Sequence, residues 1–173
     1  MKTAVIYNSQ TGFTKRYAKW IAEESKADCF ELNEAKKKNL NGYDAIIFGG
    51  WACAGGISKL NWFKERLNEW KGKKLITFCV GGSPMDSPHV TPLLEKVFTE
   101  EEHKQVSTFY CPGGFNYEKM SVSSRLMMKM YAKMLKSKKN KTEDDEAMIK
   151  MISHSNDMSD RKYIVPIIEC LYS

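Results

Sequence analysis

The sequence predicts an α/β domain built on a parallel sheet with crossover helices. Its 173 residues fall within the roughly 100–200 residues of a typical single domain. Short apolar runs alternate along the chain with amphipathic stretches of helical length, which is the pattern of parallel strands joined by helices. Most of these apolar runs are continuous, as is typical of strands covered on both faces. We therefore expect one domain over residues 1–173, with helices on both faces of the sheet.

Five apolar runs are the expected strands. Each is short, and each is bounded by polar residues, glycine or proline, as strands commonly are. The continuous apolar character again indicates burial on both sides. The expected strands are Thr3–Tyr7, Asp28–Leu32, Asp44–Phe48, Lys74–Val80 and Val106–Cys111.

The helices are expected between and after these strands, where apolar residues recur at the spacing of one helix face. In the first such stretch Tyr17, Ala18 and Ile21 share a face. The third follows Ser87-Pro88, a capping residue and a proline suited to a first turn. The expected helices are Thr14–Ser25, Asn61–Trp70, Val90–Phe98, Ser121–Lys136, Thr142–Ser153 and Arg161–Tyr172, the last interrupted by Pro166.

The composition excludes several classes of protein. With 42% hydrophobic and 28% charged residues, the chain is neither disordered nor collagen-like. The longest nearly apolar run, Ala45 to Ile57, is too short and too rich in glycine for a transmembrane helix. No signal peptide is expected at the start of the chain. Five widely spaced cysteines without a CxxC motif predict reduced thiols in a cytoplasmic protein and no metal site.

The first expected strand is followed by the segment Asn8 to Thr14, which leads directly into a helix. Three hydroxyls, one glycine and a helix N-terminus suit a phosphate monoester, because backbone N–H groups and the helix dipole favour an anion there. The segment is neither a Walker loop nor a GxGxxG motif. In the alternative interpretation Thr11 or Thr14 only caps the helix.

The third and fourth expected strands end in small residues that suit a flat ring. Gly49 to Gly56 holds four glycines and Trp51, and the fourth strand is followed by Gly81-Gly82-Ser83. Small residues let the backbone approach a ligand closely, and Trp51 offers a stacking surface. Alternatively, Trp51 is a core residue and the glycines only form turns.

The run Val5-Ile6-Tyr7-Asn8-Ser9-Gln10-Thr11-Gly12-Phe13-Thr14, with Ala18 and Ile21, resembles the signature of the flavodoxins. The resemblance extends to about Tyr117. It implies a five-stranded parallel sheet in the order 2-1-3-4-5 and FMN as cofactor. It further implies a phosphate site at Ser9, Gln10, Thr11, Gly12, Phe13 and Thr14, and a ring site at Gly50, Trp51, Ala52, Cys53, Ala54, Gly55, Gly81, Gly82 and Ser83.

One departure from the flavodoxin pattern concerns the second face of the flavin. Many flavodoxins supply a second stacking aromatic after the fourth strand, and this chain has none between Val80 and Val97. The second face is therefore open, covered by Met85, or covered by the C-terminal part of the chain. Cys53 is interpreted as a small packing residue and not as a redox thiol.

The positive charge of the chain is concentrated in one segment. Lys119 to Lys141 carries seven lysines, one arginine and no acid, which leaves 19 basic and 21 acidic residues elsewhere. It belongs to a methionine-rich helical elaboration expected at about 119–153. On a helical wheel of its first helix, one half is apolar and the other cationic. The apolar half holds Leu126, Met127, Met130, Tyr131, Met134 and Leu135, and the cationic half holds Arg125, Lys129, Lys133 and Lys136.

Three interpretations of this helix remain open. Its apolar half packs on the domain, or the helix makes peripheral contact with an anionic membrane, or it docks to an acidic redox partner. Nucleic acid is not expected, because the segment has one aromatic residue and no nucleic-acid motif.

Gly113-Gly114-Phe115-Asn116-Tyr117, followed by Arg125 to Met130, is similar to the tail of menaquinone-dependent protoporphyrinogen oxidases of the flavodoxin type. The two resemblances together imply an FMN-binding redox protein that transfers electrons, as a quinone-linked oxidoreductase. The alternatives are an electron carrier between partner proteins and a flavin-free interaction module. No catalytic residue is assigned.

Overall fold

The computed structural model describes all residues, Met1–Ser173. Its core is a parallel sheet in the order β2-β1-β3-β5-β6, which confirms the predicted order of the five main strands. A short strand, β4 (Gly56–Ile57), pairs antiparallel with the end of β3. The main strands are β1 (Thr3–Tyr7), β2 (Asp28–Glu31), β3 (Ala45–Cys53), β5 (Lys74–Gly81) and β6 (Val106–Pro112).

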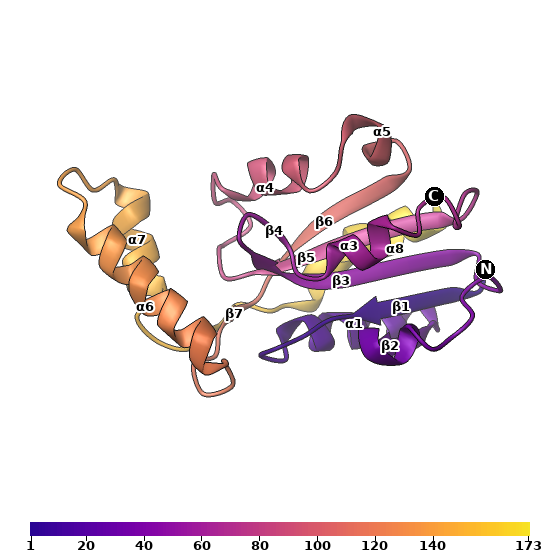
Figure 1. Ribbon diagram of the computed structural model, residues 1–173, viewed down its shortest axis with the longest axis horizontal. Coiled ribbons are helices and arrows are strands. Elements are labelled where there is room, and N and C mark those ends of the chain that lie inside the picture. The colour runs from indigo at the N-terminus through magenta and orange to yellow at the C-terminus, as the bar shows by residue number, and fades with distance from the viewer.

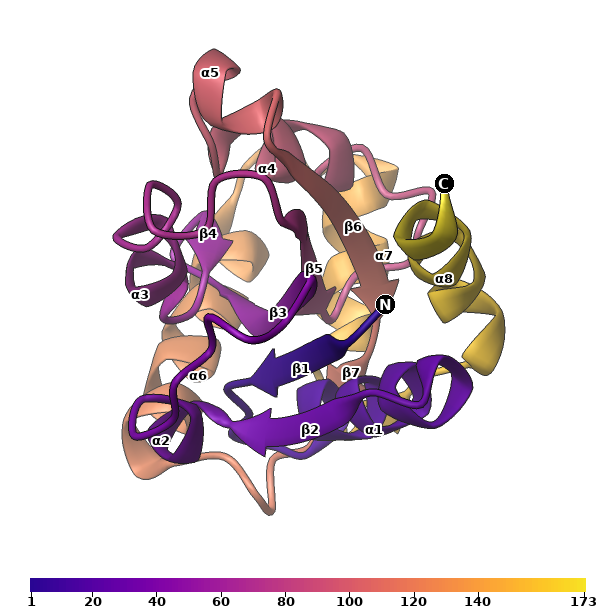
Figure 2. The ribbon, with the colours of Figure 1, turned by 90° about the vertical axis from the view of Figure 1, so that its right-hand side faces the viewer.

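Helices cover both faces of the sheet (Figure 2). One face packs against α1 (Phe13–Ser25) and α8 (Val165–Tyr172), with Tyr17 and Ile167 fully buried between them and the strands. The other face packs against α2 (Leu32–Ala35), α3 (Leu60–Lys64) and α4 (Val90–Lys96). Successive strand residues alternate between these two cores, because strand side chains point to opposite faces.

Three elements differ from the sequence prediction by more than two residues. Strand β3 runs to Cys53, five residues beyond the predicted end, because its pairing with β5 continues through Gly49, Gly50 and Trp51. Helix α3 ends at Lys64, and the chain continues in turns to Trp70, which is still buried. The break in the last helix comes before Pro166: a 3-10 turn, Arg161–Ile164, precedes α8, and Pro166 lies in the first helical turn, where it needs no N–H partner.

Several short elements were not predicted. They include α2, α5 (Glu100–His103) and β4, none longer than four residues. Helix α5 begins with a capping box in which Thr99 accepts a hydrogen bond from Glu102 N. Elements this short bury few side chains, so the hydrophobic periodicity of the sequence does not predict them.

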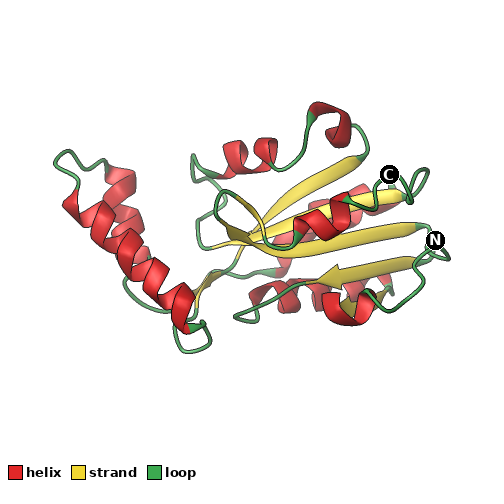
Figure 3. Cartoon of the chain, in the orientation of Figure 1, coloured by secondary structure: helices red, strands yellow, loops and turns green.

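The chain between β6 and α8 leaves the sheet at its carboxyl end. It passes through β7 (Gly114–Phe115), α6 (Val122–Ser137), α7 (Glu143–Met151) and β8 (Asn156–Asp157), and β7 pairs with β8 as an antiparallel ribbon. Helices α6 and α7 pack together and stand beyond the strand ends (Figures 1 and 3). No helix combines the length and apolar character needed to cross a membrane.

Two side chains of α1 fasten the ends of this excursion. The guanidinium of Arg16 donates to the Asp157 carboxylate at 2.5 Å and to the Ser159 hydroxyl at 2.5 Å. The Tyr17 hydroxyl donates to the carbonyl of Pro112 at 2.6 Å and accepts from Asp160 N at 3.2 Å. The ends of the excursion are therefore held against the first helix.

Candidate flavin site

The loop between β1 and α1 presents free backbone donors. Gly12 has φ 101°, a left-handed conformation that favours glycine, and its N–H donates to Ser9 Oγ at 3.2 Å. No side chain caps α1, and the N–H groups of Phe13, Thr14 and Lys15 make no hydrogen bond within the protein. Thr11 and Thr14 therefore do not act as side-chain caps. The uncapped helix start favours an anion.

The hydroxyl of Thr14 also lacks a protein partner. The residue is 2% exposed and lines a cavity, so its hydroxyl is held where a ligand could reach it. Gln10 lies beside it and spans to the N-terminus of α6. Its amide donates to Ser121 Oγ at 3.3 Å, and its carbonyl oxygen accepts from Ser124 Oγ at 3.1 Å. Helix α6 is thereby fixed next to the loop.

The β3–β4 hairpin forms a second wall. Ala54 (φ 49°) and Gly55 (φ 76°) are both left-handed, as a tight two-residue hairpin turn requires. Behind the turn, Ser58 Oγ accepts from Trp51 N at 3.1 Å and from Asn8 Nδ2 at 3.2 Å. Gly50 packs so tightly that a Cβ would lie 2.6 Å from the Ser58 carbonyl oxygen. The hairpin is thus anchored to the end of β1.

The loop after β5 forms a third wall, and Tyr110 holds it. The Tyr110 hydroxyl donates to the carbonyl of Ser83 at 2.8 Å and accepts from Ser83 N at 3.0 Å. Burial raises the pKa of Tyr110, so its phenol keeps the proton that it donates. The Phe115 ring packs directly against the backbone of Gly82. A Cβ at Gly82 would lie 2.3 Å from Cζ of Phe115.

These walls enclose two adjoining cavities. The smaller, of about 280 Å³, lies between the β1–α1 loop, the hairpin, the β5 loop and the first turns of α6. The larger, of about 630 Å³, lies between the hairpin, α4 and the α6–α7 pair. Both are bounded by Phe115 and Met128, and no carboxylate lines either one. The arrangement is an anion cradle that opens into an apolar, uncharged slot.

Comparison with known proteins decides the family. Residues 4–142 match the family described as Flavodoxin domain, which is most of the chain. The chain belongs to the flavodoxin domain family. The order of its five main strands is the one that the resemblance in the sequence implied.

One curated relative and two solved structures illustrate the similarity. The flavodoxin-like domain-containing protein BilS of Clostridioides difficile is 27% identical over 119 residues, which cover 65% of this chain and 66%, just under two thirds, of that protein. The flavodoxin, WrbA-like protein of Agrobacterium tumefaciens is 20% identical, with a TM-score of 0.50, over 70% of this chain and 86% of its own. A Lactobacillus acidophilus flavoprotein in complex with FMN is 17% identical over 64% of this chain and 91% of its own, with a TM-score of 0.41.

In this flavodoxin-family chain, most of the predicted site residues line the two cavities. Gln10, Thr11, Phe13 and Thr14 face the smaller one, and Gly12 faces a neighbouring hollow next to Arg16. Ser9 and Gly50 line neither cavity and act through the contacts given above. The remaining residues that face one or both cavities are Trp51, Ala52, Cys53, Ala54, Gly55, Gly81, Gly82 and Ser83.

One interpretation of a single residue is wrong. Cys53 is the exposed cysteine of the five and its side chain faces both cavities, so it is not a packing residue. By contrast, Cys79 is buried in the core, where burial raises the pKa of its thiol to about 12 and keeps it protonated. The position of Cys53 follows from the extension of β3 into the hairpin.

Sequence reasoning missed the residues that close the slot. Phe115, Met127 and Met128 all border the smaller cavity, whereas Met85 does not. The C-terminal excursion, and not Met85, therefore borders this cavity. The aromatic motif around Phe115 was visible in the sequence, but its distance along the chain from the other site residues concealed its role.

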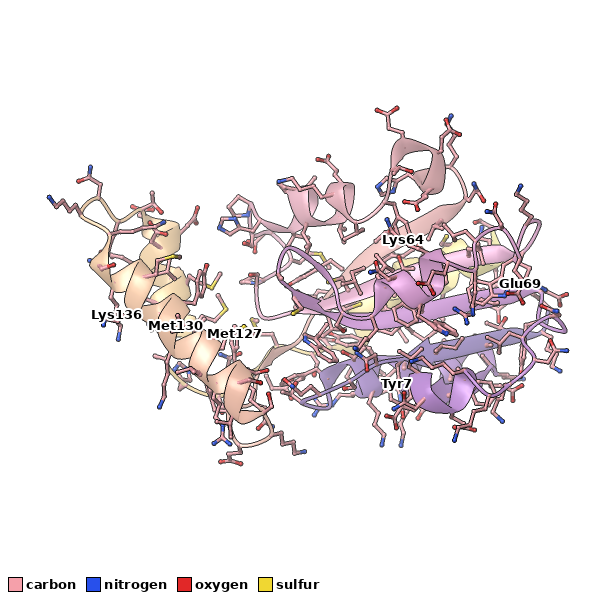
Figure 4. All side chains as sticks on the ribbon, viewed as in Figure 1. Tyr7, Lys64, Glu69, Met127, Met130 and Lys136 are labelled. Atoms are coloured by element: carbon pink, nitrogen blue, oxygen red, sulfur yellow. The ribbon has the colours of Figure 1, made fainter.

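The packing interpretation of α6 is also wrong for most of its apolar half. Only Leu135 is buried, while Leu126, Met130 and Met134 are 58%, 64% and 52% exposed. Helix α6 is rotated so that Ser124, Met128, Ala132 and Leu135 are its least exposed residues. Figure 4 shows Met127 on the side of α6 near the sheet, and Lys136 near the far end of the helix.

Proposed function

We propose that this protein binds FMN and transfers electrons through it. The observation that carries the proposal is the set of free N–H groups at the start of α1, which opens into an apolar slot without carboxylates. A phosphate needs the first feature and a flat, uncharged ring needs the second. The membership of the flavodoxin family points to the same cofactor.

The residues present fit FMN. The N–H groups of Phe13 and Thr14, together with the Thr14 hydroxyl, would hold the phosphate. Trp51 and the backbone at Gly81 and Gly82 would bound the ring. FMN, when bound, supplies the one- and two-electron chemistry, and the chain positions it and sets its electrostatic surroundings. Because no carboxylate lines the slot, nothing nearby disfavours a negatively charged reduced ring.

The larger cavity favours an oxidoreductase over a carrier. A carrier needs only an exposed flavin edge, whereas this chain keeps about 630 Å³ open beside the slot. We propose a quinone-linked oxidoreductase of the protoporphyrinogen oxidase type as the finer function. An enzyme of this kind reduces a quinone with purified components, while a carrier requires a reductase protein. Turnover that depends on an added reductase would favour the carrier.

FMN binding is the first measurement. We expect the purified protein to take up one FMN per chain, with a shifted flavin absorbance spectrum and a higher melting temperature. At a free FMN concentration 100 times the Kd, the expected stabilisation is about 2.7 kcal/mol. Riboflavin, which lacks the phosphate, should bind more weakly. A protein that stays colourless and shows no thermal shift with FMN would favour the flavin-free interaction module.

We further propose that α6 contacts an anionic membrane surface. Its exposed apolar residues Leu126, Met130 and Met134 adjoin a row of cations, Arg125, Lys129, Lys133 and Lys136, along the same helix. Apolar residues beside lysines are typical of helices that lie in the lipid interface. The packing alternative would have buried this surface.

Vesicle flotation tests this contact. We expect the full chain to float with vesicles containing phosphatidylserine and not with phosphatidylcholine alone. Replacing Lys129, Lys133 and Lys136 by glutamine should weaken binding by roughly 100-fold, since each such residue contributes about 1 kcal/mol near an anionic surface. Replacing the exposed Lys36, Lys37 and Lys71 by glutamine changes the net charge equally and should have a much smaller effect. Equal losses in the two triple variants would contradict the proposal.

A further inference from the structure

The larger cavity is a chamber between the body of the protein and the α6–α7 pair. Leu93 and Lys96 of α4 form one wall, and Met128 of α6 with Met148 of α7 forms the other. Its volume of about 630 Å³ lies within the range of pockets for small organic molecules, about 300–1,000 Å³. Phe115 lines both this chamber and the smaller cavity, so an occupant would lie beside the slot proposed for the flavin.

The charges on the chamber wall have one sign. Lys96 is the charged residue of the lining. His89, at the N-terminal end of the same helix, adds an imidazole ring whose nitrogens can donate or accept a hydrogen bond. Lys96 takes part in no ion pair, and no carboxylate reaches the cavity. A free ammonium on an otherwise apolar wall suits a molecule that is apolar over most of its surface and anionic at one end.

We propose that this chamber binds a flat, apolar organic acid whose carboxylate pairs with Lys96. Its ring system would lie against Leu93, Phe115 and the methionines Met128 and Met148, whose unbranched side chains adapt to varied shapes. The inference rests on the proposed function in one respect: it places the acid beside the slot proposed for the flavin. Binding itself depends only on residues of the chain.

The test compares two probes of one shape, 2-naphthoate and its uncharged analogue 2-naphthamide. Methionine methyl groups labelled with carbon-13 report the position of each probe by NMR. We expect the Met128 and Met148 signals to move on titration, while the signals of Met130 and Met134, exposed on the outside of α6, stay in place. Naphthoate should bind more tightly than naphthamide.

Substitution of Lys96 then tests the charge. Lys96→Gln should weaken naphthoate binding about three- to fivefold, the value of a partly exposed ion pair, and leave naphthamide unchanged. Lys104→Gln, an exposed lysine outside the chamber, is the matched control and should change neither probe. Equal affinities for the two probes, no effect of Lys96→Gln, or shifts confined to Met130 and Met134 would each overturn the proposal.

FMN separates this inference from the proposed function. Naphthoate should still bind when the protein is loaded with FMN, and displacement of naphthoate by FMN would show that the chamber is part of the flavin site and overturn the inference. A chain that binds naphthoate in the predicted manner but never binds FMN would support the chamber and overturn the flavin proposal. The two failures are therefore distinct.

Discussion

Replacing Gly49 by alanine is expected to lower the free energy of unfolding by about 3 kcal/mol or more. Gly49 lies in the centre of the sheet, where β3 pairs with both β1 and β5. A Cβ at this position would lie 2.0 Å from Cζ of Phe78 and 2.5 Å from each of its Cε atoms. Phe78 is fully buried, so its ring could move only by displacing neighbouring core side chains. Overpacking of a tight core commonly costs about 1–3 kcal/mol, and a clash this severe lies at the upper end.

Gly42 provides the matched control. It is an exposed glycine without a positive φ, and no atom lies within 4 Å of the place that an alanine methyl group would take. Gly42→Ala should therefore change stability by less than about 1 kcal/mol. Urea denaturation followed by circular dichroism measures both variants. If Gly49→Ala unfolds at the same urea concentration as Gly42→Ala, the tight contact between β3 and Phe78 is not present in solution.

The same glycine shows why the end of β3 differs from the sequence prediction. The predicted strand ends at Phe48, so Gly49 and Gly50 are expected to follow it. In the structure they belong to β3, because Phe78 and Ser58 occupy the space that larger side chains would need. Extension of β3 through them places Trp51 and Cys53 at the hairpin. Where two distant segments approach closely, the sequence shows the glycine that permits the approach but not the residue that it contacts.

Local patterns, in contrast, predicted the main strands and the phosphate-type loop. The runs around Val5, Ile47 and Ile76 are buried on both faces and read as continuous apolar segments. The capping residues Ser121 and Thr142 lie directly before α6 and α7, as helix signals at these positions indicate. The hydrophobic periodicity does not predict the rotation of α6. Its apolar half is clear in the sequence, but the hydrogen bonds of Gln10 to Ser121 and Ser124, which hold the start of the helix, join segments far apart in the chain.

Thr14→Val is expected to weaken FMN binding by about 10- to 100-fold while leaving riboflavin binding unchanged. The Thr14 side chain is almost completely buried, yet its hydroxyl has no partner in the protein and faces the cavity at the start of α1. A hydrogen bond to a charged group contributes about 1.5–3 kcal/mol, which corresponds to this range of affinity. Valine has nearly the same shape, so the helix and its packing should be retained.

The comparison of the two flavins makes the test specific. Riboflavin lacks the phosphate, so a general distortion of the site would weaken both ligands, whereas loss of a phosphate contact weakens FMN alone. Thr14→Ser keeps the hydroxyl and should restore most of the FMN affinity. Equal losses for FMN and riboflavin in Thr14→Val would place the phosphate elsewhere. In that case the free N–H groups of Phe13 and Lys15 would need another anion, because an uncapped helix start next to an apolar cavity leaves its donors without a partner.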